Sequence, residues 1–454
     1  MHFGIRNNSR VARALGESGL TFLRHSLDAL TRLLPHVETL GWSVTAGQAT
    51  SGATFSDQTR RELNLSLQVA VDSANYAIKG RLRRRAAEAG VGAVSRTIDI
   101  REHAIADRIL KNIENILKNT SDTDPSARLA LRAGFDERVV ANHLTHRFSL
   151  DIDLEAWFEW LRRLAEQTYE NKSLVFGCLI DTSSGAKPEP GSAFPTAFLE
   201  KKKYRALSDG YHTAYQVSRY GAVDGFIDLR GSRPESHRYF PAWCEDLAAR
   251  SRKAKVGLCL TRQGDILILD GGKLTFSYRF GRWQYWNHAH IVNLITNAAR
   301  VQHVLPRLLS RIVRALYRAT LDVSFRRSGG LFVLLRREDN LRSIVRRGDA
   351  VGDDGRDDVD NAFDGALSLA EIAALPRSVL AEMASLDGAV VLANTGRILS
   401  YGAVLEPRKR RGILKAEGSR TKAAIGASNY GLSLKVSSDG DITVYVGGKE
   451  LIRV

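Results

Sequence analysis

The C-terminal part of the chain reads LDGAVVLANTGRILSYGAVLEP at residues 386–407 and GSRTKAAIGASNYGLSLKVSSDGDITVYVGG at residues 418–448. The apolar run after the Asp-Gly pair predicts a buried strand at 388–393, and two further apolar runs predict strands near the end of the second stretch. Between them, a Gly-Ser turn precedes a helix that we expect to begin near Arg420. Helices and strands that alternate in this way indicate a mixed α/β domain.

Two groups of residues in these stretches suit a phosphate-containing ligand. Asp387 lies at the start of the predicted strand, and Gly388 allows a ligand or a backbone segment to approach closely. The free amides of a helix N-terminus, together with Arg420 and Lys422, favour phosphate groups. A carboxylate one strand away can hold Mg²⁺ or Mn²⁺ against those phosphates. The residues therefore predict a site for a metal ion and a phosphate chain.

Similar short motifs occur earlier in the chain and in the same order. The pairs are Asp224-Gly225-Phe226 with Asp387-Gly388-Ala389, Gly257-Leu258-Cys259-Leu260 with Gly431-Leu432-Ser433-Leu434, and Gly264-Asp265-Ile266 with Gly440-Asp441-Ile442. Gly-Asp and Gly-Gly pairs are common in hairpin turns, so a chance resemblance is the alternative. The shared order favours an internal duplication.

The overall pattern predicts an α/β (α+β) fold in three parts. Residues 1–150 read as mostly helical, because leucines recur near helical spacing in their first part and again at Ile98–Leu117. From residue 154 onward helices alternate with short β-rich runs. We therefore predict a helical region at 1–150, a degenerate mixed-sheet domain at 151–290 that serves as a sensor or dimerisation partner, and a nucleotide-binding mixed-sheet domain at 291–454.

Composition limits the class of protein and suggests an anionic partner. Of the 454 residues, 44% are hydrophobic, as expected for a globular protein. The formal net charge of +16 indicates an anionic partner, which could be a polynucleotide, a nucleotide triphosphate or a membrane surface. No apolar run approaches the roughly 18 residues that a membrane span needs. Cys178, Cys244 and Cys259 lack metal-ligand spacing and suit a reducing cytoplasm.

Other charged clusters admit more than one interpretation. His143 and His146 stand three apart, but an ordinary surface pair is the simpler interpretation because no third ligand is evident. The acidic run at 353–360 does not have the residue spacing of a calcium-binding loop, and we interpret it as a solvent-exposed loop. Arg408–Arg411 lies near the expected phosphate site. A role in phosphate binding and a solvent-exposed loop are equally favoured for this run. The basic N-terminal helices leave nucleic acid as a possible partner that no motif supports.

The paired stretches resemble the diadenylate cyclase domain of the bacterial DNA-integrity scanning protein and of membrane-bound cyclases. The family's Asp-Gly-Ala motif is matched by Asp387-Gly388-Ala389, and its Gly-Thr-Arg-His-Arg-Ala-Ala motif by Gly418-Ser419-Arg420-Thr421-Lys422-Ala423-Ala424. The family's second acidic metal ligand follows a Ser in its penultimate strand, where this chain has Ser437-Ser438-Asp439. The resemblance covers the C-terminal third of the chain.

This resemblance implies a reaction and a role for each matched residue. Asp387 would bind Mg²⁺ or Mn²⁺ with Asp439 and help deprotonate a ribose 3′-OH, while Arg420, Lys422 and Ser419 would hold the triphosphate of ATP. Two facing ATP molecules would condense into cyclic di-AMP, which requires a homodimer or a pseudo-dimer within one chain. The remaining site residues implied by the motifs are Gly388, Ala389, Gly418, Thr421 and Ser437.

Two departures from the family motif leave a second function open. Thr421 stands in place of the family's His, and Lys422 stands in place of its second Arg. A Lys lacks the planar fork with which Arg binds phosphate through two hydrogen bonds. The alternative is therefore a nucleotide sensor, in a bacterial signalling or anti-phage system, that binds its ligand without cyclising it. In the earlier copy, Ser236-His237-Arg238 is the loose counterpart of the basic turn.

Overall fold

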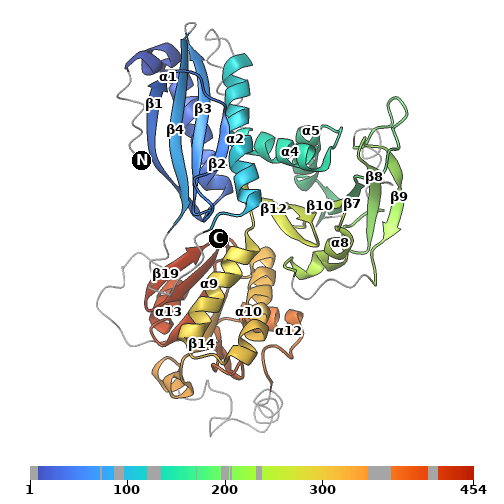
Figure 1. Ribbon diagram of the computed structural model, residues 1–454. Helices are drawn as coiled ribbons and strands as arrows, with labels where there is room; N and C mark the ends of the chain where they lie inside the picture. Colours follow the sequence, from blue (N-terminus) through green and yellow to red (C-terminus); the bar gives the residue numbers. More distant parts are fainter. Residues whose placement is uncertain are drawn as a thin grey trace. The chain divides into compact units, whose positions relative to one another are not determined.

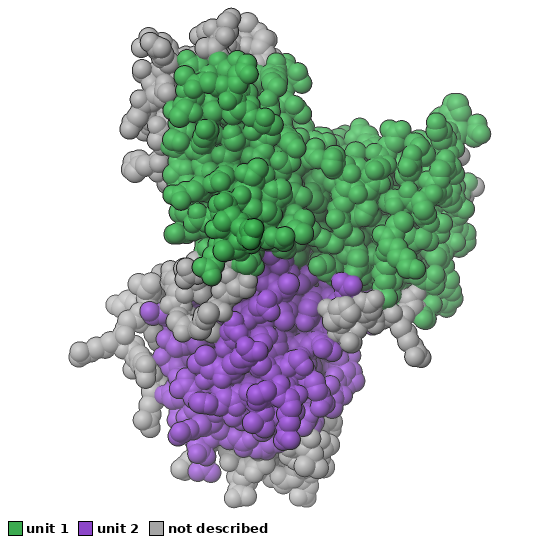
Figure 2. Space-filling view, viewed as in Figure 1, with its two compact units in different colours: residues 1–86, 96–235, 246–286 green, residues 87–95, 236–245, 287–454 purple. Residues whose placement is uncertain are grey.

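The computed structural model describes residues 9–71, 74–85, 97–119, 134–169, 171–195, 204, 207–231, 238–345, 370–406 and 418–454. The chain forms two compact units, which Figure 2 shows in green and purple. Unit 1 comprises residues 1–86, 96–235 and 246–286, and unit 2 comprises residues 87–95, 236–245 and 287–454. The α+β fold class is as predicted, whereas the division of the chain into three parts stays a prediction.

The expectation of a helical N-terminal region is wrong for residues 37–84. Helices α1 (Ser9–Leu33), α2 (Ile100–Asn119) and α4 (Phe135–Phe148) are present, but a four-stranded antiparallel sheet lies between the first two in the sequence (Figure 1). Its order is β1-β4-β3-β2, with bounds β1 (Val37–Ala46), β2 (Gly52–Phe55), β3 (Glu62–Val71) and β4 (Ala74–Arg84).

The signal for this sheet is an alternation with a period of two. In β3, the buried side chains of Leu63, Leu65 and Leu67 alternate with those of Asn64 and Ser66. Such an alternation places the leucines on one face of a strand, whereas a helix would distribute them around its axis. The leucines join a core that includes residues of α1, α2, α4 and the second sheet of unit 1.

The second sheet of unit 1 has seven strands in the order β13-β12-β11-β10-β7-β8-β9. Strands β7 and β8 are parallel, and every other neighbouring pair is antiparallel. The bounds are β7 (Phe176–Asp181), β8 (Thr213–Ser218), β9 (Val223–Asp228), β10 (Lys255–Leu260), β11 (Ile266–Asp270), β12 (Lys273–Arg279) and β13 (Arg282–Tyr285). Helix α5 (Leu154–Ala165) and the small hairpin of β5 (Thr168–Tyr169) and β6 (Lys172–Ser173) precede it, and α8 (Glu245–Arg250) precedes β10.

Unit 2 contains a six-stranded sheet in the order β16-β15-β14-β17-β18-β19. The strands are β14 (Gly330–Leu335), β15 (Ala389–Leu392), β16 (Ile398–Ala403), β17 (Gly431–Val436), β18 (Ile442–Val446) and β19 (Lys449–Arg453). The sequence predicted neither β16 nor β19. The helical segments are η2 (Ala242–Cys244), α9 (His288–Val301), α10 (Pro306–Arg326), η3 (Glu338–Ser343), α12 (Arg377–Ser385) and α13 (Ser419–Ala427). Strands β14 and β15 form its parallel pair.

The two large sheets share strand order and strand direction, as an internal duplication predicts. The order β9-β8-β7-β10-β11-β12 of unit 1 corresponds to β16-β15-β14-β17-β18-β19 of unit 2. The turns after β10 and β17 also match, because Thr261 and Ser437 each accept a hydrogen bond from an Asp backbone N–H four residues later, at 3.0 Å in both cases. Thr261 and Ser437 are therefore equivalent positions.

Two of the three motif correspondences are wrong. The register aligns Leu260 with Val436, so Gly257 corresponds to Ser433 rather than to Gly431. Asp224-Gly225-Phe226 lies in β9, which corresponds to β16, whereas Asp387-Gly388 directly precedes β15. Because Asp-Gly pairs are frequent near strand ends and turns, matching them by order alone misplaced this pair by one strand.

In the part of the chain that the structure describes, no helix is long and apolar enough to cross a membrane.

Candidate functional site

The predicted site residues lie at the end of the six-stranded sheet of unit 2 where β14 and β15 begin and β17 ends. We call this row of strand ends the sheet edge. Gly330, the first residue of β14, pairs with Val436 at the end of β17. On its other side β14 runs parallel to β15, with Phe332 opposite Val390. Asp387 precedes β15 and Ser437 follows β17, so these two residues flank the start of β14 at the same edge.

Arg420 is brought to this edge by helix α13. Ala424 and Ala427 are buried in one cluster with Leu331 of β14, which holds the helix against the sheet. The guanidinium of Arg420 occupies the space that a Cβ atom on Gly329 would fill. Gly329 also has a φ of +68°, a conformation that disfavours other residues. The glycine thus permits a cation to lie over the chain between Asp387 and Ser437.

The N-terminus of α13 is not capped by a side chain. Gly418 is the N-cap residue, and the first backbone bond of the helix runs from the N–H of Lys422 to the carbonyl of Gly418. The amides of residues 419–421 therefore have no acceptor within the helix. The first turn contains no acidic residue. The amides, the helix dipole and two cationic side chains all favour an anion here.

The two acidic residues predicted as metal ligands are both exposed. Asp387 lies before β15 and Asp439 in the turn after β17, so β14 separates them, which corresponds to roughly 10 Å between their backbones. Among the described residues, no group of three side chains could hold a metal ion. One carboxylate together with phosphate oxygens is sufficient for Mg²⁺. The donor set therefore fits a metal ion that arrives with a triphosphate.

Gly388 and Ala389 hold the strand in place. Gly388 has a φ of +138°, and a Cβ atom there would collide with the backbone of Gly402 in β16. Ala389 is buried in the core. The close approach that we expected at Gly388 is therefore made by a backbone segment, and Asp387 is the member of this tripeptide that offers an exposed polar side chain.

Lys435 is a cation at this site that sequence reasoning missed. It lies in β17 between Leu434 and Val436, both buried, and its Nζ donates a hydrogen bond to the Oγ1 of Thr421 at 3.0 Å. Lys435 pairs with Leu331 and so shares the face that α13 covers. The available signal was a lysine between a leucine and a valine of a buried strand. Thr421 thus positions the ammonium group of Lys435.

Unit 1 carries different residues at the equivalent places. The register aligns Tyr215 with Val390, which places His212 at the position of Asp387. His212 forms a pair with Asp209 at 2.9 Å. Gln263 stands at the position of Asp439, in agreement with the predicted absence of an acid there. The residues before α8, Pro241-Ala-Trp-Cys, belong to unit 2 and form no basic turn.

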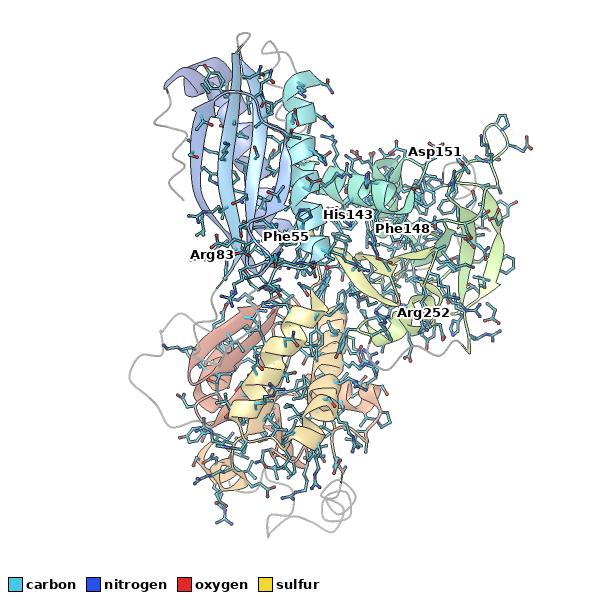
Figure 3. The ribbon with its side chains drawn as sticks, in the orientation of Figure 1. Phe55, Arg83, His143, Phe148, Asp151 and Arg252 are labelled. Atoms are coloured by element: carbon cyan, nitrogen blue, oxygen red, sulfur yellow. The ribbon has the colours of Figure 1, made fainter. Side chains whose placement is uncertain are left out.

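The histidine pair does not form a joint site. Figure 3 shows His143 on α4, where its ring lies edge-on to that of Phe276, with 5.6 Å between ring centroids. Burial, followed by the charge of Arg147, lowers the pKa of His143 to about 3, so this side chain is a neutral core residue. His146 is exposed. The expectation of an ordinary surface pair is therefore wrong for His143.

A cavity of about 730 Å³ lies at the N-terminal sheet of unit 1 and is separate from the residues discussed above. Lys79, Arg81 and Lys111 line it together with Asp107, which pairs with Lys111 at 2.8 Å. The acidic run at 353–360, the basic run at 408–411 and residues 236–237 lie outside the described residues.

The comparisons with known proteins give partial structural matches. No protein-family model and no curated protein matches the chain. Among solved structures, it is similar to a hypothetical membrane spanning protein from Bacillus cereus, with 23% identity, a TM-score of 0.25 and coverage of 36% of this chain and 74% of the other. It is also similar to a double cysteine mutant of DacA from Staphylococcus aureus, with 20% identity, a TM-score of 0.21 and coverage of 32% of this chain and 87% of the other.

Proposed function

We propose that unit 2 binds ATP with Mg²⁺ or Mn²⁺ and acts as a diadenylate cyclase. The observation that carries this proposal is the position of Arg420, whose guanidinium lies over Gly329 between Asp387 and the turn at Ser437. One carboxylate for the metal ion, one guanidinium and an uncapped helix N-terminus then meet at one sheet edge. The motif resemblance of this region to diadenylate cyclases supports the same assignment.

The proposed chemistry consists of two identical transfers. The 3′-oxygen of one ATP attacks the α-phosphorus of the other, a new P–O bond forms, and the bond to the β-phosphate breaks to release pyrophosphate. Asp387 would accept the proton of the 3′-hydroxyl or hold a Mg²⁺ or Mn²⁺ ion, which would lower the pKa of that hydroxyl. Arg420 and Lys422 stabilise the charge on the phosphates. The protein contributes mainly orientation and charge, which this set of residues supplies.

Two ATP molecules must face each other, and unit 1 is poorly suited to hold the second. Its sheet carries His212 in place of the acid, and the segment before α8, Pro241-Ala-Trp-Cys, belongs to unit 2 and is not basic. An intramolecular pair of competent sites is therefore disfavoured. We propose instead that unit 2 of one chain pairs with unit 2 of a second chain, so that synthesis depends on dimerisation.

A nucleotide sensor is the second candidate, and the state of Thr421 favours it. The hydroxyl of Thr421 accepts a hydrogen bond from Lys435, so its Oγ1 is already engaged. Lys422 provides a point charge where the related motif has a planar guanidinium. A site with these replacements retains the charge needed to bind a triphosphate and loses geometric control over the transferred phosphate.

The two candidates are separated by incubating the purified chain with ATP and Mn²⁺ or Mg²⁺ and analysing the products. Cyclase activity predicts cyclic di-AMP and two pyrophosphates per product, with a rate per chain that rises with protein concentration as dimers form. Saturable ATP binding that Arg420→Ala removes, without any product, would reject synthesis and support the sensor. The absence of ATP binding would reject both functions.

A further inference from the structure

We infer that Lys435 is a phosphate-binding residue of this site, and that Thr421 holds its ammonium group in position for the triphosphate. This inference rests on the proposed nucleotide-binding function and adds a third cation to it. The ammonium lies 3.0 Å from the Oγ1 of Thr421, a residue of the first turn of α13. A side chain from the sheet and a helix terminus thus converge on one point.

The location of Lys435 in the sheet places its side chain on the face that carries the proposed phosphate site. Lys435 pairs with Leu331 of β14 on one side and with Thr443 of β18 on the other, and it lies two residues before Ser437 at the sheet edge. Because side chains alternate along a strand, Lys435 and Ser437 project from the same face. That face is the one on which α13 packs and over which Arg420 reaches.

Two buried hydroxyl groups lie on the same face of the sheet as Lys435. Ser433 and Thr443 project from the same face as Lys435 and are buried, with exposed fractions of 0% and 1%. The Oγ of Ser433 and the Oγ1 of Thr443 have no hydrogen-bond partner among the described residues. Buried hydroxyls usually have a hydrogen-bond partner, and an ordered water or a bound ligand would supply one here. This is a second observation that points to a ligand.

The equivalent position in unit 1 supports a role in ligand binding rather than in sheet formation. The register aligns Lys435 with Cys259, a buried residue of β10. The same strand therefore forms with a small apolar side chain at this place. Unit 2 instead carries a lysine in an interior strand, with its ammonium group hydrogen-bonded to Thr421 in the first turn of α13.

Geometry also explains how the chain compensates for the departures in its basic motif. A threonine at position 421 is short and leaves room for a long side chain to enter from β17. The resulting set is Arg420 and Lys422 from the helix and Lys435 from the sheet. The positive charge is thus delivered from a different element, with Thr421 acting as the positioning residue.

The test is a binding series with α,β-methylene ATP, which cannot release pyrophosphate, and with adenosine, which has no phosphate. Lys435→Met should weaken binding of the ATP analogue by about tenfold or more and leave adenosine binding unchanged. Lys435→Arg should retain most of the affinity, and Thr421→Val should produce a smaller loss. Lys449→Met, an exposed lysine on β19, is the matched control and should bind like the unmodified chain.

Each outcome decides between the inference and the function on which it rests. If Lys435→Met binds the analogue normally while Arg420→Ala loses it, the role of Lys435 is wrong and the proposed nucleotide site stands. An equal loss of analogue and adenosine binding, accompanied by a lower melting temperature, would show that Lys435 is only structural. If the unmodified chain binds no nucleotide, the proposed function fails first.

Discussion

The seven-stranded sheet of unit 1 and the six-stranded sheet of unit 2 have the same strand order and differ at the edge where their parallel strands begin. The equivalent residues are His212, Cys259 and Thr261 in unit 1 and Asp387, Lys435 and Ser437 in unit 2. The buried faces of the strands determine how they pair, whereas the residues at the strand ends can change without altering that pairing. The same topology therefore carries an acid at the position of Asp387 and a lysine at the position of Lys435 in one copy only.

The difference extends to the first residue of the central strand. Unit 2 has Gly330 there, preceded by Gly329, over which Arg420 lies. Unit 1 has Phe176, which contacts Phe194 and Trp160 with ring centroids 5.7 Å and 5.4 Å apart. Aromatic rings thus pack in unit 1 at the position of Gly330, where a Cβ atom in unit 2 would meet the carbonyl of Ala384 and the side chain of Val323. The proposed ligand site lies in unit 2, where Gly329 leaves room for the guanidinium of Arg420.

The largest expected effect comes from exchanging the acid at the start of β15. Asp387→Asn preserves the size of the side chain and removes its charge, so it should reduce formation of cyclic di-AMP by about 100-fold or more. The matched substitution in unit 1 is His212→Ala, at the equivalent but exposed position. It should leave the rate within about twofold of the unmodified chain. Product formation with ATP and Mn²⁺ measures both.

Thermal melting of both variants is the control for folding. A similar loss of activity in Asp387→Asn and His212→Ala, with unchanged melting temperatures, would show that both sheets contribute to catalysis. The contrast between an active and an inactive copy would then be wrong.

How much of this could be read from the sequence depends on the kind of signal. The strand after Asp387 and the helix near Arg420 were predictable, because apolar runs and turn residues are local patterns. The correct pairing of the two copies was not, because Asp224-Gly225 mimics the motif and only strand register shows that it lies in β9. Lys435 was missed for the same reason, since its contact with Thr421 joins residues from two elements.

The two units should also differ in their response to acid. Burial lowers the pKa of His36 and His143 in unit 1 to about 3, with nearby arginines adding to the shift. The unfolded chain takes up protons near pH 6.5 while the folded unit does not, so the stabilising effect of these neutral side chains is complete above pH 6.5. It is lost progressively as the pH falls toward 3. Unit 1 should therefore be destabilised between pH 7 and pH 5.

A substitution isolates the contribution of one histidine. His143→Leu cannot be protonated, so it should recover about 2 kcal/mol of the unfolding free energy that the unmodified chain loses between pH 7 and pH 5, from about 1.4 kcal/mol per pKa unit. Five of the six tryptophans lie in unit 1, so denaturant titrations followed by tryptophan fluorescence report on it. Exposed His146→Leu is the control, and an identical pH dependence of all three proteins would contradict the assignment.

The smallest expected effect tests whether the open glycine edge is what allows unit 2 to bind phosphate. Gly329→Ala removes no charge, but its Cβ would displace the guanidinium of Arg420 and its φ of +68° would be strained. Gly447→Ala introduces comparable strain, at a φ of +59°, where no atom lies within 4 Å. We expect Gly329→Ala to weaken binding of α,β-methylene ATP by about tenfold, whereas Gly447→Ala should retain the affinity and lose only about 1 kcal/mol of stability. Equal affinities for the two variants would mean that the position of Arg420 over Gly329 is not needed, and the difference between the two sheets would then lie in their charges alone.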